Sequence, residues 1–106
     1  MGGLPPIFLL AAIALPVAAA AADPESGRAK AAACAVCHGQ SGISSLPNAP
    51  HLAGQPAIYV EEQLRRYRSG ERRNELMNVV AKPLSDADIA DLAAWFASIR
   101  LEATLP

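Results

Sequence analysis

The feature that most restricts what this chain can fold into is a pair of cysteines separated by two residues and followed at once by a histidine. The segment reads Cys34-Ala35-Val36-Cys37-His38, and the 106-residue chain has no other cysteine. On a helical turn, side chains three and four residues apart project to the same side. Both thiols and the imidazole can therefore act on one group, and the identity of that group decides the function.

This pattern is typical of covalent attachment of a c-type haem. The two thiols would meet the two vinyl groups of the porphyrin while the imidazole reaches the iron. Both cysteines are then thioethers, so no thiol remains to be oxidised outside the cytoplasm. We predict one covalently bound haem c, with Cys34 and Cys37 as its attachment points and His38 as an axial ligand of its iron.

Three alternatives to haem attachment stay open at this point. A Cys34–Cys37 redox disulfide of the thioredoxin type is expected after a strand, whereas a helix is predicted before Cys34. A zinc site could use Cys34, Cys37, His38 and His51, although adjacent Cys and His ligands are an uncommon pairing and no second Cys/His cluster follows. Chance occurrence is the third, and the helical and export patterns elsewhere in the chain speak against it.

Residues 1–22 carry no charged side chain, and all Lys, Arg, Asp and Glu residues lie after them. An apolar run is followed by small residues, and Ala20 with Ala22 fits the small-x-small rule for cleavage before Asp23. No Lys or Arg precedes the run, which is unusual for a signal peptide. We predict a secretory signal peptide over 1–22 and a periplasmic domain over 23–106. Uncleaved, the segment would be a membrane anchor.

The remainder of the chain predicts helices and no strands. Three helices are expected, over residues 24–33, 56–69 and 86–99. The first has Asp23 as its N-cap and Pro24 at the first position, which needs no amide hydrogen. The last has a capping box of Ser85 and Asp88, followed by apolar residues at intervals of three and four. Residues 39–55 are rich in Gly, Pro, Ser and Asn and predict a loop.

Met77 is the one thioether left once residues 1–22 are removed. It lies between Gly70 and the helix cap at Ser85, far enough along the chain to return across a haem held at His38. A thioether paired with an imidazole raises the reduction potential of haem iron. We predict Met77 as the second axial ligand. The alternatives are a gap-filling core methionine at this position and His51 as the ligand, which we interpret as a surface histidine instead.

Further motifs accompany the cysteine segment. They are a first helix containing Gly27, the run Pro50-His51-Leu52-Ala53-Gly54-Gln55, Tyr59, Gln63-Leu64, Gly70 with Arg72, Met77 and Leu84-Ser85-Asp86. Together they resemble the class I c-type cytochromes, in particular the small bacterial periplasmic kind called cytochrome c4 or cytochrome c-553. The resemblance covers nearly all of residues 23–106. A single Cys-x-x-Cys-His departs from the two-haem form common in that group.

The resemblance implies a fold and a ligand set. The fold would be all-α, a class I cytochrome c fold with three to four helices packed around one covalently bound haem. His38 would be the proximal ligand, Met77 the distal ligand, and the carbonyl of Pro50 the acceptor that orients the His38 ring. Gly27 would let the first and last helices cross closely.

Ten apolar residues are expected to line the haem or to close the helices around it: Leu52, Ile58, Tyr59, Leu64, Val79, Val80, Leu84, Leu92, Trp95 and Phe96. Two of them also carry a polar tip. We predict that Tyr59 and Trp95 reach haem propionates with their hydroxyl and indole groups.

The charge balance restricts the partners. Nine Lys and Arg face ten Asp and Glu, a formal net charge of −1, so nucleic-acid binding through overall positive charge is excluded. Five arginines lie within 65–73, without an aromatic stacking platform for nucleic acid. We interpret them as a solvated helix face with interspersed glutamates. The alternative is a docking patch for an acidic partner.

An iron with six ligands has no open position for a substrate. The sequence therefore predicts an electron carrier and not an enzyme, passing single electrons between larger redox proteins such as a cytochrome, an oxidase or a dehydrogenase. A cytochrome subunit of a periplasmic dehydrogenase or oxidase complex would use the same chemistry. An enzyme or gas sensor would need Met77 off the iron, and a thiol or metal module would lack haem.

Overall fold

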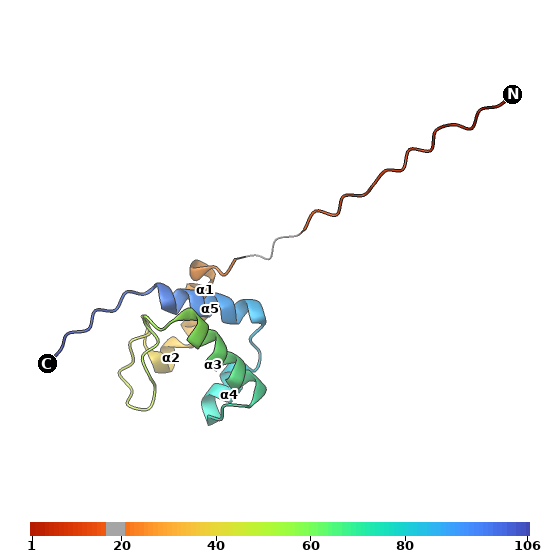
Figure 1. The fold of residues 1–106 in the computed structure, drawn as a ribbon. Coiled ribbons are helices and arrows are strands. Elements are labelled where there is room, and N and C mark those ends of the chain that lie inside the picture. Colours follow the sequence, from red (N-terminus) through yellow and green to blue (C-terminus); the bar gives the residue numbers. More distant parts are fainter. Residues whose placement is uncertain (17–20) are drawn as a thin grey trace.

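The computed structural model describes residues 1–16 and 21–106, and all regular structure in these ranges is helical (Figure 1). The helices are α1 (Pro24–Lys30), α2 (Ala35–His38), α3 (Ala57–Ser69), α4 (Glu75–Ala81) and α5 (Asp86–Ser98), and a 3-10 turn, η1 (Ala31–Ala33), joins the first two. The all-α prediction is confirmed.

The N-terminal segment forms no helix in residues 1–16, 21 and 22. Its large apolar side chains, from Leu4 to Leu15, are exposed. Ala20, the first of the two small residues of the predicted cleavage motif, falls within residues 17–20, which lie outside the described chain. Over the described residues, no helix combines the length and the apolar character needed to cross a membrane.

The first predicted helix is interrupted. Asp23 caps α1 as expected, since its carboxylate accepts a hydrogen bond from the Glu25 N–H at 3.1 Å. The α-helix ends at Lys30, and the alanines that follow continue as the 3-10 turn. Helical structure thus reaches Ala33 as predicted, but its last three residues are 3-10 and not α-helical. After this 3-10 turn, the cysteine segment forms a separate helix, α2.

Helices α1 and α5 cross in close contact, and Gly27 is the reason. It is buried, and a Cβ built on it would lie 1.9 Å from the Asp91 carbonyl oxygen and 2.8 Å from the Trp95 Cβ. No side chain larger than hydrogen fits there. The predicted close crossing at Gly27 is confirmed.

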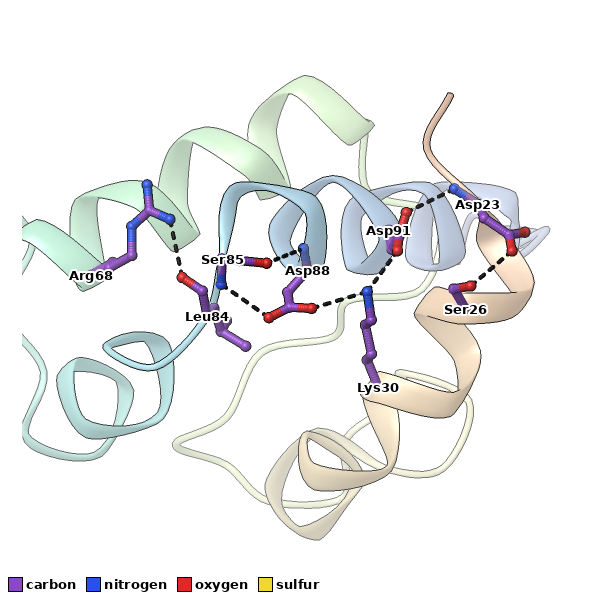
Figure 2. Close-up of polar contacts among 8 residues, drawn as sticks. All are labelled: Asp23, Ser26, Lys30, Arg68, Leu84, Ser85, Asp88 and Asp91. Carbon is purple, nitrogen blue, oxygen red and sulfur yellow. Dashed lines mark hydrogen bonds and ion pairs between the residues drawn. The ribbon is translucent and has the colours of Figure 1, made fainter. Parts of the chain in front are cut away.

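A group of charged side chains joins α1 to the first half of α5 (Figure 2). The Lys30 ammonium lies 2.7 Å from Asp91 and 3.0 Å from Asp88. Asp88 also closes the predicted capping box, because its N–H donates to the Ser85 hydroxyl while its carboxylate accepts the Ser85 N–H, both at 3.0 Å. We call Lys30, Asp88 and Asp91 the α1–α5 clasp.

The contacts within the clasp shift the pKa values of all three of its residues. Hydrogen bonds from Ser85 N–H and from Lys30 lower the pKa of the Asp88 carboxyl to about 2. The Asp23 N–H and Lys30 lower the pKa of the Asp91 carboxyl, and the two carboxylates raise the pKa of Lys30. All three groups are charged at neutral pH even with their ordinary pKa values, and these shifts widen the pH range over which they stay charged.

The core is formed where α3 and η1 meet α5. One cluster of buried residues contains Ala31, Val60, Leu92, Ala93 and Phe96. Half-buried apolar side chains pack around it, among them Cys34, Leu52, Leu64, Leu84 and Trp95. The cluster and the side chains around it together include six of the ten residues expected to line a haem or close the helices around it: Leu52, Leu64, Leu84, Leu92, Trp95 and Phe96. Most of the fully buried residues are small, so this core alone is modest for its chain length.

Candidate haem site

The cysteine motif adopts the helical turn that its spacing requires. The N–H groups of Cys37 and His38 donate to the carbonyl of Cys34 at 3.2 and 2.9 Å. Gly39 then ends α2 with φ of +82°, where a Cβ would lie 2.0 Å from the Ile43 carbonyl oxygen. Both thiols and the imidazole therefore arise from one side of a short helix whose end is fixed by a glycine.

His38 is the one buried polar side chain among the described residues, with 8% of its surface exposed. Its Nδ1 lies 2.8 Å from the carbonyl oxygen of Pro50. A carbonyl can only accept, so Nδ1 carries a proton, and in the neutral imidazole Nε2 then keeps its lone pair. This is the state in which an imidazole binds a metal, with its orientation fixed from behind.

The two cysteines lie in different surroundings along the same turn. Both are half-buried, and Cys34 packs against the core cluster. Burial there raises the pKa of the Cys34 thiol, so this thiol stays protonated at neutral pH. Cys34 could form a thioether with a haem vinyl group, which would take up both its sulfur and its thiol hydrogen.

The loop over residues 39–55 brings Pro50 to His38. The carbonyl of Gly42 accepts hydrogen bonds from Leu52 N–H at 2.7 Å and Ala53 N–H at 3.0 Å, and the N–H of Gly54 donates to the Phe96 carbonyl at 2.9 Å. These bonds close the loop on itself and tie it to α5. The Pro50 position expected from the family resemblance is thus built by backbone contacts outside the motif.

Met77 lies in the first turn of α4 and is half-buried. The Asn74 side chain caps this helix, accepting from the N–H groups of Leu76 and Met77 at 3.1 and 3.0 Å. Asn78 ties the same turn to α3, because its side-chain amide donates to the carbonyls of Tyr67 and Arg72, both at 2.8 Å. The backbone around Met77 is therefore held from both sides.

The two aromatic side chains predicted to reach propionates differ in their exposure to solvent. Tyr59 is on α3 and exposed, whereas Trp95 is half-buried on α5 against α1. The guanidinium of Arg28 stands 5.6 Å from the centre of the Trp95 ring. For both residues, contact with a propionate stays a prediction.

Several large apolar side chains of the domain are exposed. Leu76 is 63% exposed, Val79 72% and Ile58 78%, and Val36, Ile43, Leu46 and Val80 are exposed as well. They come from α2, the loop, α3 and α4. Of the residues expected to line a haem, Val79, Val80, Ile58 and Tyr59 are thus not part of the protein core.

Four of the five arginines within residues 65–73 contact neighbouring residues. Arg65 and Arg66 pair with glutamates four residues earlier, and Arg68 lies 2.7 Å from Asp86 at the start of α5. Arg68 also donates to the Leu84 carbonyl at 3.1 Å (Figure 2). Arg72 stands over the Tyr67 ring. The interpretation as a solvated face with acidic partners fits these contacts.

The sequence did not indicate the contacts that two loop residues, Ser44 and His51, make in the structure. Ser44 was not singled out, and His51 was interpreted as a surface histidine. His51 is exposed, yet its Nδ1 accepts a hydrogen bond from the Ser44 N–H at 2.8 Å. The structure does not gather His51 with the cysteines, and within the described ranges no three Cys, His, Asp or Glu side chains form a group able to hold a metal ion.

Comparison with known proteins decides the family. Residues 25–100 match the family model described as cytochrome c. Cytochrome c4 of Pseudomonas aeruginosa is 45% identical over 85 residues, which are 80% of this chain and 42% of that protein. The chain belongs to the cytochrome c family.

Further relatives of this cytochrome c have different lengths. Cytochrome c-554(548) of Halomonas halodenitrificans is 42% identical over 81 residues, 74% of this chain and 98% of that protein. A protein of Thiomonas intermedia named thiosulfate dehydrogenase electron acceptor is 42% identical over 88 residues, 82% of this chain and 38% of its own. This cytochrome c thus spans less than half the length of the cytochrome c4 and electron-acceptor relatives, and nearly all of the c-554(548).

The fold agrees with a solved relative. The crystal structure of reduced recombinant cytochrome c4 from Pseudomonas stutzeri superposes with a TM-score of 0.71 at 39% identity, covering 76% of this chain and 47% of that one. The predicted class I cytochrome c fold is confirmed.

Family membership also gives the cofactor of this cytochrome c, a covalently bound haem c, and Cys34 and Cys37 fit its Cys-x-x-Cys-His attachment motif. The residues present fit that group. Two thiols share one helical turn with a buried imidazole whose Nδ1 is already engaged. Large apolar side chains remain uncovered around a small core, and a porphyrin is a large apolar surface for such side chains to cover.

Proposed function

We propose that this cytochrome c is an exported carrier of single electrons. The observation that carries the proposal is the pairing of a buried His38, its Nδ1 held by the Pro50 carbonyl at 2.8 Å, with two thiols on the same helical turn. When bound, haem c supplies an iron that changes its oxidation state by one electron. The protein residues hold that iron and tune it.

Each residue of the proposed site has a separate task. Cys34 and Cys37 form the two thioether links, which fix the porphyrin edge to α2. His38 binds the iron through Nε2, and the Pro50 carbonyl orients the ring and increases its basicity. Met77 would supply a thioether sulfur as the second iron ligand, a soft ligand that raises the reduction potential.

Because His38 and Met77 would both bind the iron, the proposed function is electron transfer and not catalysis. With both side chains bound, a substrate has no vacant iron position to occupy. The bonds from Asn74 and Asn78 that hold the Met77 backbone favour a distal ligand that stays in place. Little movement of ligands between oxidation states keeps electron transfer fast.

We propose residues 1–22 as a secretory signal peptide and residues 23–106 as the domain that acts in the periplasm. The uncharged apolar run and the small residues before Asp23 support this division. Attachment of haem through two cysteines suits a compartment in which free thiols oxidise. If the segment were retained, the domain would be tethered to a membrane.

The partners are proposed to be larger redox proteins. A relative at 42% identity is named as the electron acceptor of a thiosulfate dehydrogenase, which favours a dehydrogenase as the electron donor for this chain. The same name supports the second candidate, a cytochrome subunit in a periplasmic dehydrogenase or oxidase complex. Size-exclusion chromatography of a native extract separates the two, since a carrier elutes as a small protein and a subunit elutes with its enzyme.

Replacement of Met77 tests the proposed ligand set. Oxidised wild-type protein is expected to show the sulfur-to-iron charge-transfer band, and Met77→Ala to lose it and bind added cyanide or imidazole readily. Glu75→Ala is the matched control, because Glu75 is an exposed neighbour on the same helix and is not one of the apolar side chains that would cover a haem; it should keep the band. An unchanged Met77→Ala spectrum would remove Met77 from the site.

A further inference from the structure

Two side chains of the loop connect the ends of the haem motif without belonging to it. The Ser44 hydroxyl lies 3.1 Å from two carbonyl oxygens, those of Cys37 and Leu46, which share its one hydrogen. The Ser44 N–H donates to Nδ1 of His51 at 2.8 Å. His51 directly follows Pro50, whose carbonyl accepts from His38 Nδ1. His38 in turn directly follows Cys37.

These contacts close a ring. It runs from Cys37 through the peptide bond to His38, across a hydrogen bond to Pro50, through the next peptide bond to His51, and back through Ser44 to Cys37. We call it the proximal ring. Hydrogen bonds that close on themselves restrict one another, so each one limits the freedom of the rest.

His51 contributes the one side-chain acceptor of the proximal ring. Its donor is a backbone N–H, so the direction of the bond is fixed and His51 Nδ1 must carry a lone pair. The carbonyl of His51 also accepts from the Gln55 side chain at 3.3 Å. The peptide group that bears the Pro50 carbonyl contains the backbone nitrogen of His51, so both contacts of His51 restrict that peptide group.

We propose that His51 is a positioning residue for the haem iron: through Ser44 and Pro50 it fixes the hydrogen bond that His38 Nδ1–H donates. The inference rests on the proposed role of His38 as the iron ligand. A firm Nδ1–H···O bond makes the imidazole a stronger electron donor and favours ferric iron. When that bond is loosened, the ferrous state gains, so the reduction potential rises.

The acceptor of His51 can be removed and restored by substitution. His51→Leu removes it, whereas His51→Asn places an amide oxygen at the same number of bonds from the backbone as Nδ1. Because His51 is exposed, neither change opens a cavity in the core. Asn48→Leu is the matched control, adding the same apolar side chain to another exposed position of the same loop.

Two readouts on the exported, haem-loaded protein report on the bond. They are the reduction potential by equilibrium titration and the solvent-exchange rate of the His38 Nδ1 proton by NMR. For His51→Leu we expect a higher potential and exchange faster by about fivefold or more, the factor that loss of one ordinary hydrogen bond gives. His51→Asn and Asn48→Leu should stay close to wild type.

Ser44→Ala tests the proximal ring from its other end. It should shift the potential in the same direction, and the double variant with His51→Leu should shift it no further than the larger single change, because one ring is broken in each case. Equal values for wild type, His51→Leu and Ser44→Ala would overturn the inference, as would equal shifts in His51→Leu and His51→Asn. Wild-type protein without covalent haem would overturn the proposed function as well, so the two failures are distinguishable.

Asp23, the first residue of the proposed mature domain, contacts the α1–α5 clasp through its backbone nitrogen. The Asp23 N–H donates to Asp91 Oδ1 at 2.8 Å (Figure 2). If residues 1–22 are removed as proposed, this nitrogen becomes an α-amino group, positively charged at neutral pH. We infer that signal cleavage itself adds a charge to the α1–α5 clasp, converting an amide hydrogen bond to Asp91 into an ion pair.

The α-amino group would face a charged neighbourhood of known composition. Asp91 accepts from it, Lys30 shares the other Asp91 oxygen, Asp88 lies beyond Lys30, and the Asp23 carboxylate is its own side chain. Hydrogen bonds with both partners charged are stronger than those of a neutral amide. The processed domain should therefore be more stable than one extended at its N-terminus.

The comparison needs two exported, haem-loaded proteins, one beginning at Asp23 and one with two extra alanines before it. Denaturant unfolding at pH 6 should show a higher midpoint for the protein that begins at Asp23. The difference should vanish at pH 10, above the ordinary α-amino pKa of about 8, and also when both proteins carry Asp91→Asn. Equal midpoints at pH 6 would overturn this inference alone. N-terminal sequencing that places the mature start elsewhere would overturn it together with the proposed cleavage site.

Discussion

Gly27 shows how one residue decides where a helix can lie. The contact between α1 and α5 brings the Asp91 carbonyl to a point that any Cβ on residue 27 would occupy. Gly70 is glycine for a different reason: its φ is +85°, and nothing lies within 4 Å of a Cβ built there. One glycine gives space and the other gives a backbone conformation.

These two causes predict different costs. Gly27→Ala must push backbone against backbone, so we expect it to destabilise the domain by about 3 kcal/mol or more. Gly70→Ala adds only left-handed backbone strain at a helix end, about 1 kcal/mol. Denaturant unfolding of the haem-loaded proteins measures both. Equal losses for the two variants would contradict the close crossing of α1 and α5.

For single residues, the sequence predicted a site correctly where the spacing of residues along the chain alone determines how their side chains are arranged. The Cys34 to His38 spacing requires one helical turn, and the structure has that turn. The partner of His51 could not be read in the same way, because it depends on how residues 39–55 fold back on themselves. Likewise Trp95 gives no sign in sequence that it lies against Arg28.

Among the helices, the sequence predicted those with strong ends and missed a short one. The capping box at Ser85 and the glycine stop after α3 are as expected. Helix α4 was left unassigned, although Asn74 followed by Glu75 is a start signal, because seven residues give little periodicity. The end of α1 was unreadable for the opposite reason: alanines favour helix so generally that they do not show where one stops.

Asn78 is the residue that fastens α4 to α3. Its amide donates to the carbonyls of Tyr67 and Arg72, and its oxygen accepts from Asn74 N–H, each at 2.8 Å. Asn78→Ala removes all three bonds, and we expect a loss of about 2 kcal/mol. Hydrogen exchange should quicken in α4 while α5 keeps its protection. Asn48→Ala is the control, and unchanged exchange in α4 for Asn78→Ala would refute the anchoring role.

For the whole molecule, the α1–α5 clasp links stability to pH. The pKa of Asp88 is lowered to about 2, and that of Asp91 is lowered as well. A carboxyl with a folded-state pKa below its ordinary value of about 3.9 stabilises the fold above that value, and the benefit is lost as pH falls. The clasp should therefore weaken between about pH 4 and pH 2.

Thermal unfolding of the haem-loaded protein at a series of pH values checks this. Wild type should lose stability between about pH 4 and pH 2 more steeply than the double variant Asp88→Asn/Asp91→Asn, in which neither carboxyl titrates. Glu62→Gln, which alters an exposed pair on α3, should follow wild type. Parallel curves for wild type and the double variant would show that the clasp does not set the acid limit.

The fold and the haem motif together indicate that a small helical domain encloses a porphyrin, which is joined to it by two carbon–sulfur bonds. The mass of the protein, exported and matured in a cell that attaches haem and then denatured in acid, tests this most directly. We predict the mass of residues 23–106 plus one haem, with the haem absent when Cys34 and Cys37 are both replaced by alanine. A mass equal to that of the unmodified polypeptide would contradict the account.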